Sequence, residues 1–259
     1  MTHTEDGMGN KSWLRIGVEV VAVIFSILAA FGIDAWWDDQ QATRSELAAL
    51  EGLRGEFFEN RERLAERILT NFEAMEVVGE FFRASPADVR RMPAEEAAQM
   101  AVDIWAPFTF DPAVGATTSF LARGPAVTEQ GERVRRAVTE WQTAFLDAGE
   151  ELAVLWNASR EVLGLQTEHV ADLAPPEGLR PTLITLMMVG GPERLAMMRA
   201  DERLMSATVA KIHLQTIYTG ELAGLAELGD SLLAQLDVDM SALAPFAAFG
   251  RWSPPPPHR

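Results

Sequence analysis

The apolar stretch over residues 13–37 constrains the fold of this chain more than any other part of the sequence. Between residues 16 and 33 it carries a single charged side chain, Glu19. A helix over those residues is about 27 Å long, close to the hydrocarbon thickness of a bilayer. Tryptophans favour the membrane–water interface, and they stand at both ends of the stretch: Trp13, Trp36 and Trp37. The sequence therefore predicts a transmembrane anchor over residues 13–37.

Two other interpretations of this stretch are open. A core helix of a soluble protein would rarely be so long and so apolar on every face. A cleaved signal peptide also begins with basic residues before an apolar run, as Lys11 and Arg15 do here. The small residues that a peptidase requires are poorly placed, since Ala29 and Ala30 lie inside the run. We therefore favour an uncleaved signal-anchor.

The charges around the stretch predict its orientation. Lys11 and Arg15 precede the apolar run over residues 16–33, whereas three aspartates follow this run and the first basic residue beyond them is Arg44. Basic residues are retained on the cytoplasmic side of a membrane. We expect a single-pass protein of the bacterial inner membrane with a short cytoplasmic tail over residues 1–12 and its main domain in the periplasm.

One face of the expected membrane helix carries small side chains. At 100° per residue, Ala22, Ser26 and Ala30 fall on the same side as Glu19. Small residues at a spacing of four allow a second helix to approach closely. These four residues predict a helix–helix contact within the membrane. The alternative is that Glu19 reaches the headgroups and that the alanines reflect only the usual composition of spans.

Charge and cysteine content exclude several classes of partner. The chain has 259 residues and a formal net charge of −16, with a pI near 4.7. Nucleic-acid binding requires a basic surface, so we expect no nucleic-acid partner. Cysteine is absent from the sequence, which excludes disulfides and thiol chemistry.

The remaining chain shows helical periodicity, and no stretch alternates with a period of two. We expect an all-α fold in which an elongated antiparallel helical bundle over residues 38–244 follows the membrane helix. A proline-rich tail follows over residues 245–259. The expected long helices are 38–83, 128–173 and one from Glu193 or Asp201 to Leu236, and the short ones are 86–92, 93–105, 113–122 and 182–189. Arg54, Arg61 and Asn71 interrupt the apolar seam of the first long helix.

The order of these features resembles a family of uncharacterised bacterial single-span membrane proteins, defined only as a domain of unknown function. The similarity begins with Glu19 opening the apolar span and Trp36-Trp37 closing it, and continues from Leu50 to Leu64. A second similar patch runs over residues 108–136, with Arg123-Gly124 where the family has a Ser-Gly turn. The resemblance implies an N-terminal anchor with a helical extramembrane domain, and it carries no activity to transfer.

Motifs for catalysis or cofactor binding are not evident in the sequence. The histidines, His3, His169, His213 and His258, stand apart from one another, and Gly190-Gly191 lacks the partners of a phosphate loop. We expect no catalytic residues, no cofactor and no metal.

The first functional hypothesis is a non-enzymatic, membrane-anchored interaction or assembly protein. Its partners would be the lipid bilayer and other membrane-protein subunits, as in a respiratory, photosynthetic or transport complex, or further copies of itself. The alternative is a periplasmic sensor or carrier that binds a ligand between the helices near Trp105, Trp141 and Trp156. A periplasmic hydrolase is the least favoured hypothesis.

Overall fold

The computed structural model describes residues 9–168, 191–238 and 240, and within these ranges the protein is all-α with no strand. The described helices are α1 (Gly9–Arg83), α2 (Pro86–Val89), α3 (Ala94–Trp105), α4 (Gly115–Leu121), α5 (Glu129–Glu168), α7 (Gly191–Ala200) and α8 (Glu202–Gln235). The predicted all-α class is confirmed. The predicted helix over 182–189, the proline-rich tail over 245–259 and residues 1–8 lie outside the described ranges.

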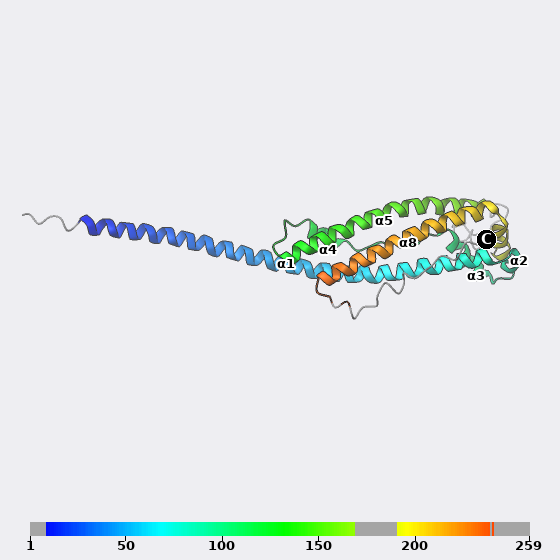
Figure 1. Ribbon diagram of the computed structural model, residues 1–259, viewed down its shortest axis with the longest axis horizontal. Coiled ribbons are helices and arrows are strands. Elements are labelled where there is room, and N and C mark those ends of the chain that lie inside the picture. The colour runs from blue at the N-terminus through cyan, green and yellow to red at the C-terminus, as the bar shows by residue number, and fades with distance from the viewer. Residues whose placement is uncertain (1–8, 169–190, 239, 241–259) are drawn as a thin grey trace, which may run out of the picture.

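Helix α1 is one continuous element of 75 residues, and it determines the elongated shape of the molecule. No proline interrupts it before Pro86, and at ~1.5 Å per residue it is about 112 Å long. Its N-terminal half projects alone from the rest of the protein, whereas its C-terminal half is part of the helical bundle (Figure 1). The predicted anchor over residues 13–37 and the predicted first bundle helix over residues 38–83 are thus parts of one helix.

The body of the protein is a bundle of α1, α5 and α8 whose far end is closed by α2, α3 and α7 (Figure 1). We call the end of the bundle nearer the projecting helix its base and the opposite end its tip. Of the two predicted starts of the last long helix, Asp201 is confirmed, because it caps α8, whereas Glu193 belongs to the separate helix α7. The Asp201 carboxylate accepts hydrogen bonds from the amides of Arg203 at 2.8 Å and Leu204 at 3.3 Å.

The expected antiparallel order holds for α8 but not for α1 and α5. Both of these helices run from the base to the tip, and α8 runs back between them (Figure 1). The reason is that the chain returns to the base over residues 106–128 before α5 begins. We call residues 106–128 the return segment; it contains α4 and an extended stretch before it.

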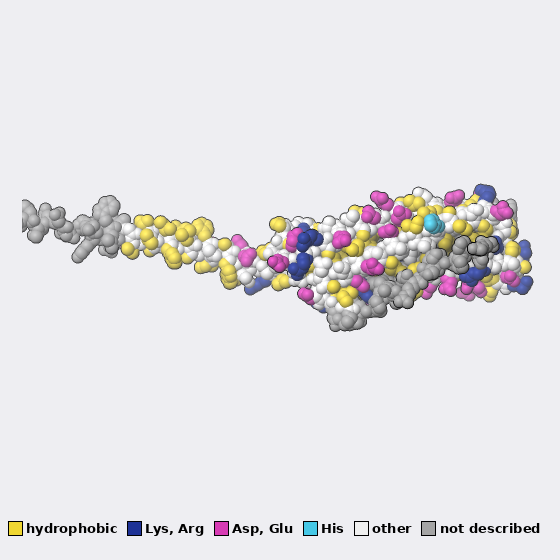
Figure 2. Space-filling model, in the orientation of Figure 1, with side chains coloured by type: hydrophobic (Ala, Val, Ile, Leu, Met, Phe, Trp, Pro, Cys, Tyr) yellow, Lys and Arg dark blue, Asp and Glu magenta, His cyan; other side chains and the backbone are white. Residues whose placement is uncertain are grey.

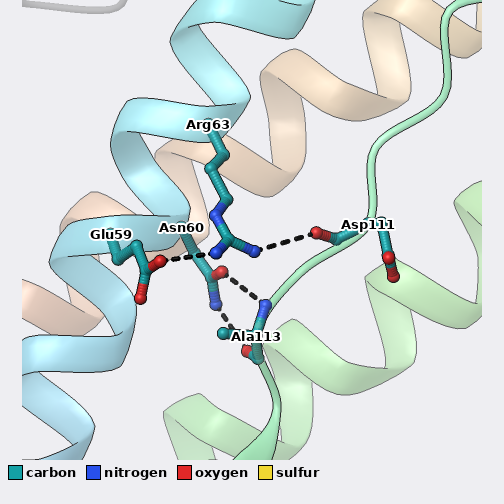
Figure 3. A network of polar contacts seen from close by, with 5 residues as sticks. All are labelled: Glu59, Asn60, Arg63, Asp111 and Ala113. Carbon is teal, nitrogen blue, oxygen red and sulfur yellow. Dashed lines mark hydrogen bonds and ion pairs between the residues drawn. The ribbon is translucent and has the colours of Figure 1, made fainter.

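Polar side chains on α1 hold the return segment in place. The amide of Asn60 exchanges two hydrogen bonds of 2.8 Å with the backbone of Ala113 (Figure 3). Asn71 Nδ2 donates to the carbonyl of Phe108 at 3.1 Å, and the Glu56 carboxylate accepts from the amides of Ala116 at 2.6 Å and Thr117 at 2.9 Å. An extended chain has no helical partners for its backbone, so these side chains replace them.

The apolar interior of the bundle consists of two clusters of buried side chains. The basal cluster is built around Trp141, whose ring stacks on Phe145 at 5.7 Å and meets the edge of Phe57 at 5.0 Å between centroids. The distal cluster joins the ends of α1 and α5 to α3, α7 and the start of α8, and includes Phe81 and Ile104. Each cluster thus fixes one end of the long helices.

The start of α5 is capped by a carboxylate from α1. Glu46 is 6% exposed, and it accepts hydrogen bonds from the amides of Val127 at 2.6 Å and Thr128 at 3.0 Å, and from the Thr128 hydroxyl. Gly131 lies directly against this carboxylate: a Cβ atom there would be 2.4 Å from Glu46 Oε1. A side chain at this position would therefore displace the Glu46 carboxylate.

We predict that Gly131→Ala lowers the free energy of unfolding by about 1–2 kcal/mol, because the new methyl group displaces the Glu46 carboxylate from its backbone donors. The matched control is Gly149→Ala on the same helix, where a Cβ atom would meet nothing within 4 Å. That change should leave stability unchanged or raise it by up to about 1 kcal/mol, since alanine favours helix. Urea denaturation followed by circular dichroism measures both. Equal effects of the two substitutions would contradict the capping role of Glu46.

Candidate functional site

The most unusual surface in the described chain is the apolar part of α1. Every side chain from residue 17 to residue 39 is exposed, including Val18 at 62%, Phe25 at 72% and Phe31 at 66%. Its most apolar window has a mean hydropathy of 2.2, and none of that window is buried. Figure 2 shows this apolar rod standing clear of the bundle. Soluble proteins rarely expose a continuous apolar surface of this size.

By length and composition, this is the one helix in the described residues that can cross a membrane. The interpretation as a core helix of a soluble protein does not hold, because the described bundle packs nothing against it (Figure 1). The remaining alternative, a signal sequence near the N-terminus, passes the same test of length and hydropathy.

The four predicted contact residues all lie on this projecting helix and are exposed: Glu19, Ala22, Ser26 and Ala30. The Ser26 hydroxyl donates to the carbonyl of Ala22 at 2.7 Å within the same helix. This hydrogen bond satisfies the hydroxyl locally, so the face carries a small side chain and no unpaired hydroxyl. A helix that packs on this face would come from another molecule, since no other described element of the chain reaches it.

The predicted interface tryptophans stand between the apolar rod and the bundle. Trp36 and Trp37 are each 58% exposed, and their rings lie 6.2 Å apart in a tilted arrangement. From Trp37 to the first buried contact at Glu46, α1 rises about 14 Å at ~1.5 Å per residue. The base of the bundle therefore begins about two and a half helical turns beyond the tryptophans. The side chain of Trp13 lies outside the described residues.

At the base, Arg123 and Glu46 join the return segment and the start of α5 to α1, and Arg135 joins α5 to the return segment. Arg123 Nη1 donates to the backbone oxygen of Ser45 at 2.7 Å and to its hydroxyl at 2.8 Å. Arg135 Nη2 donates to the carbonyl of Gly124 at 2.7 Å and lies over the ring of Phe120. Burial alone would raise the pKa of Glu46, but its hydrogen bonds from Thr128 and Val127 outweigh that effect and lower the pKa.

At the other end of the bundle, Arg199 of α7 caps the C-terminus of α1. Its Nε donates to the carbonyls of Phe81 and Ala84, each at 3.0 Å, and its Nη2 donates to the carbonyl of Phe82 at 2.7 Å. The last carbonyls of a helix have no partner within the helix, so a cation here is favourable. Charged side chains thus hold the C-terminal half of α1 at the base and at the tip of the bundle.

A buried lysine near the tip was missed by the sequence analysis. Lys211 is 0% exposed, and its Nζ donates to the carbonyls of Asp103 and Ala106 at 3.3 Å each and to Gln215 Oε1. Gln215 Nε2 in turn donates to Asn71 Oδ1 at 3.0 Å. This polar cluster joins α8 to the end of α3, to the return segment and to α1.

Burial lowers the pKa of Lys211 to about 7, and the nearby Asp103 carboxylate only partly offsets that effect. Burial likewise raises the pKa of Asp103, whose Oδ1 accepts from Gln99 Nε2 at 2.9 Å. Lys211 is enclosed by protein oxygens, so its geometry suits a structural role. A sequence signal did exist: the chain has only one other lysine, Lys11, and uses arginine elsewhere.

The tryptophans of the ligand-binding alternative do not belong to a common core cluster. Trp141 lies in the basal cluster in contact with the rings of Phe57 and Phe145, and Trp105 packs against the distal cluster. Trp156 is partly exposed on α5. Within the described residues, no group of three or more His, Cys, Asp or Glu side chains could hold a metal ion.

No protein-family model, curated protein or solved structure matches this chain. The structure defines an all-helical protein with one long apolar helix near its N-terminus, and the resemblance to the single-span family remains a prediction.

We predict that stability rises between pH 7 and pH 10 because of Lys211. In the unfolded chain this lysine keeps its proton up to about its ordinary pKa of 10.5, whereas the folded protein releases it near 7. Between these values the unfolded state binds more protons, so the free energy of unfolding increases with pH by up to about 1 kcal/mol per unit. Below pH 7 both states are protonated and the contribution is constant.

Urea denaturation of the native chain and of Lys211→Met at pH 7, 8 and 9 provides the measurement. Other groups titrate alike in both proteins, so the difference between the two stabilities isolates the lysine. Parallel curves would show that Lys211 does not titrate in this range.

Proposed function

We propose that this protein is a non-enzymatic, membrane-anchored interaction or assembly protein. In this proposal residues 13–37 form a single-pass signal-anchor in the bacterial inner membrane, with the N-terminus in the cytoplasm and the helical bundle in the periplasm. The observation that carries the proposal is the fully exposed apolar half of α1, which continues without a break into the bundle.

The energetics of the projecting helix favour lipid as its surroundings. Each large apolar side chain gains roughly 1.5–3 kcal/mol when it leaves water. The rod exposes many such side chains: Val18, Val20, Val21, Val23, Ile24, Phe25, Ile27, Leu28, Phe31 and Ile33. The backbone of a helix is hydrogen-bonded internally, so it enters the hydrocarbon without loss.

The expected partners are other membrane-protein subunits or further copies of this chain. The small side chains of Ala22, Ser26 and Ala30 permit close contact with a second membrane helix, beside Glu19. The continuous α1 then presents the bundle at a defined height above the membrane. An accessory or scaffold subunit of a respiratory, photosynthetic or transport complex would use both features.

We predict that the full-length protein stays in the membrane pellet after alkaline carbonate extraction. A chain that begins at Asp38 should appear in the soluble fraction, because it lacks the apolar rod and keeps the buried contacts of the bundle. Intact-mass measurement of the membrane-bound protein separates an anchor from a cleaved signal sequence. Release of the full-length chain by carbonate, or a mature mass that lacks residues 1–37, would overturn the anchor.

We predict that Ala30→Ile weakens association in mild detergent, because a branched side chain separates the two packed helices. Ala35→Ile is the matched control, since it makes the same change about 140° around the helix. Native mass spectrometry of the extracted complex measures the copy number and any companion subunits. If both variants retain the same associations as the native chain, the predicted contact face is contradicted.

A further inference from the structure

A groove near the tip of the bundle has no role in the anchor or in the membrane contact. It has a volume of about 920 Å³ and lies between one face of α3 and the end of α1. Its apolar lining is provided by Val77 from α1 and by Pro93, Ala94, Ala98, Met100 and Val102 in and beside α3. Ala94, Ala98 and Val102 recur every four residues, so they form a shallow stripe along about two turns of α3.

The charged side chains that line this groove in the described part of the chain are all acidic. Glu80 stands on α1, Glu95 and Glu96 stand in the first turn of α3, and Asp103 lies near its end. Among the described lining residues there is no lysine or arginine. Glu80, Glu95 and Glu96 are exposed, and Asp103 lies partly beneath Gln99, from which it accepts a hydrogen bond.

The shape and the charge together define the occupant. A shallow apolar stripe of small side chains suits a helix laid lengthwise, with apolar anchors at a spacing of three and four. The acidic side chains on α1 and at both ends of the stripe favour lysine or arginine side chains on the flanks of the bound helix. A second copy of this chain is a poor candidate, because its net charge of −16 would repel the acidic rim.

We propose that this groove binds a basic amphipathic helix of a partner protein. The proposal rests on the proposed role as an interaction protein and adds the chemistry of the partner that the bundle recognises. The membrane face and the groove would then contact different partners or different parts of one partner, because they lie on opposite ends of α1 (Figure 1).

The test uses the full-length chain in zwitterionic nanodiscs and a synthetic amphipathic peptide of leucine and lysine with a photoreactive leucine. We expect the cross-links, mapped by mass spectrometry, to lie on residues 94–103 and 77–80. The same peptide with glutamate in place of lysine, and empty nanodiscs, are the controls for charge and for lipid binding. Cross-links spread over the bundle, or equal labelling by the acidic peptide, would overturn the proposal.

Two sets of variants test the acidic side chains and the apolar stripe of the groove separately. The triple change Glu80→Gln, Glu95→Gln and Glu96→Gln should weaken peptide binding by about tenfold, since each exposed charge contributes a few tenths of a kcal/mol or more. Changing Glu140, Glu150 and Glu151 of α5 to glutamine is the matched control and should leave binding unchanged. Ala98→Trp should abolish binding by filling the stripe. Circular dichroism verifies that each variant is folded, and equal binding by both triple variants would overturn the charge assignment.

Removing residues 241–259 tests the chain itself as the occupant, because that segment contains arginine and no acid. Peptide affinity that is unchanged by the removal supports a partner in trans. A gain of about tenfold or more would assign the groove to the chain's own C-terminal segment and overturn the partner. Carbonate extraction and the Ala30→Ile comparison do not depend on this groove, so failure here is distinct from failure of the proposed function.

Discussion

The fold depends on how α1 satisfies the backbone of the return segment, in its extended stretch and at the start of α4. The buried side chains of Glu56, Asn60 and Asn71 bind successive amides and carbonyls of the return segment. An extended chain packed against a helix would otherwise lose its hydrogen bonds to water at a cost of about 1–3 kcal/mol for each unsatisfied group. These contacts return the chain to the base, so that α5 can start there beside α1. The direction of α5, and then of α8, follows from this placement.

The continuity of α1 links the two halves of the protein mechanically. Glu46 and the backbone of Ser45 fasten α4 and α5 to α1 immediately above the tryptophans, and Arg199 holds its opposite end. The rod and the bundle are thus joined by a continuous helix with no intervening loop. Any rotation or tilt that a membrane partner imposes on the apolar rod would therefore reach the tip, where α3 and the polar cluster of Lys211 lie. This arrangement suits a protein whose role is to position surfaces relative to a membrane.

Polar groups in the bundle interior specify arrangement more than they add stability. Removing the charged Lys211 amine from water costs free energy near neutral pH. The buried amine nevertheless donates to the carbonyls at the end of α3, and Gln215 extends the contact to Asn71. A purely apolar interior would leave those carbonyls unpaired and would not define which turn of α8 faces α3. The same logic applies at the base, where Glu46 selects the turn of α1 at which α5 begins.

The sequence alone determined the features that depend on local pattern. Helical periodicity and prolines located the long helices and the short ones near 86–105 and 113–122, and the run of apolar residues identified the rod that the bundle leaves uncovered. Only the tertiary structure decided that α1 and α5 run in the same direction, that Asn71 binds the return segment and that Lys211 is buried. Those outcomes join residues far apart in the chain, such as Asn71 with Gln215. Periodicity describes each helix by itself, so it carries no information about which distant groups satisfy one another's hydrogen bonds.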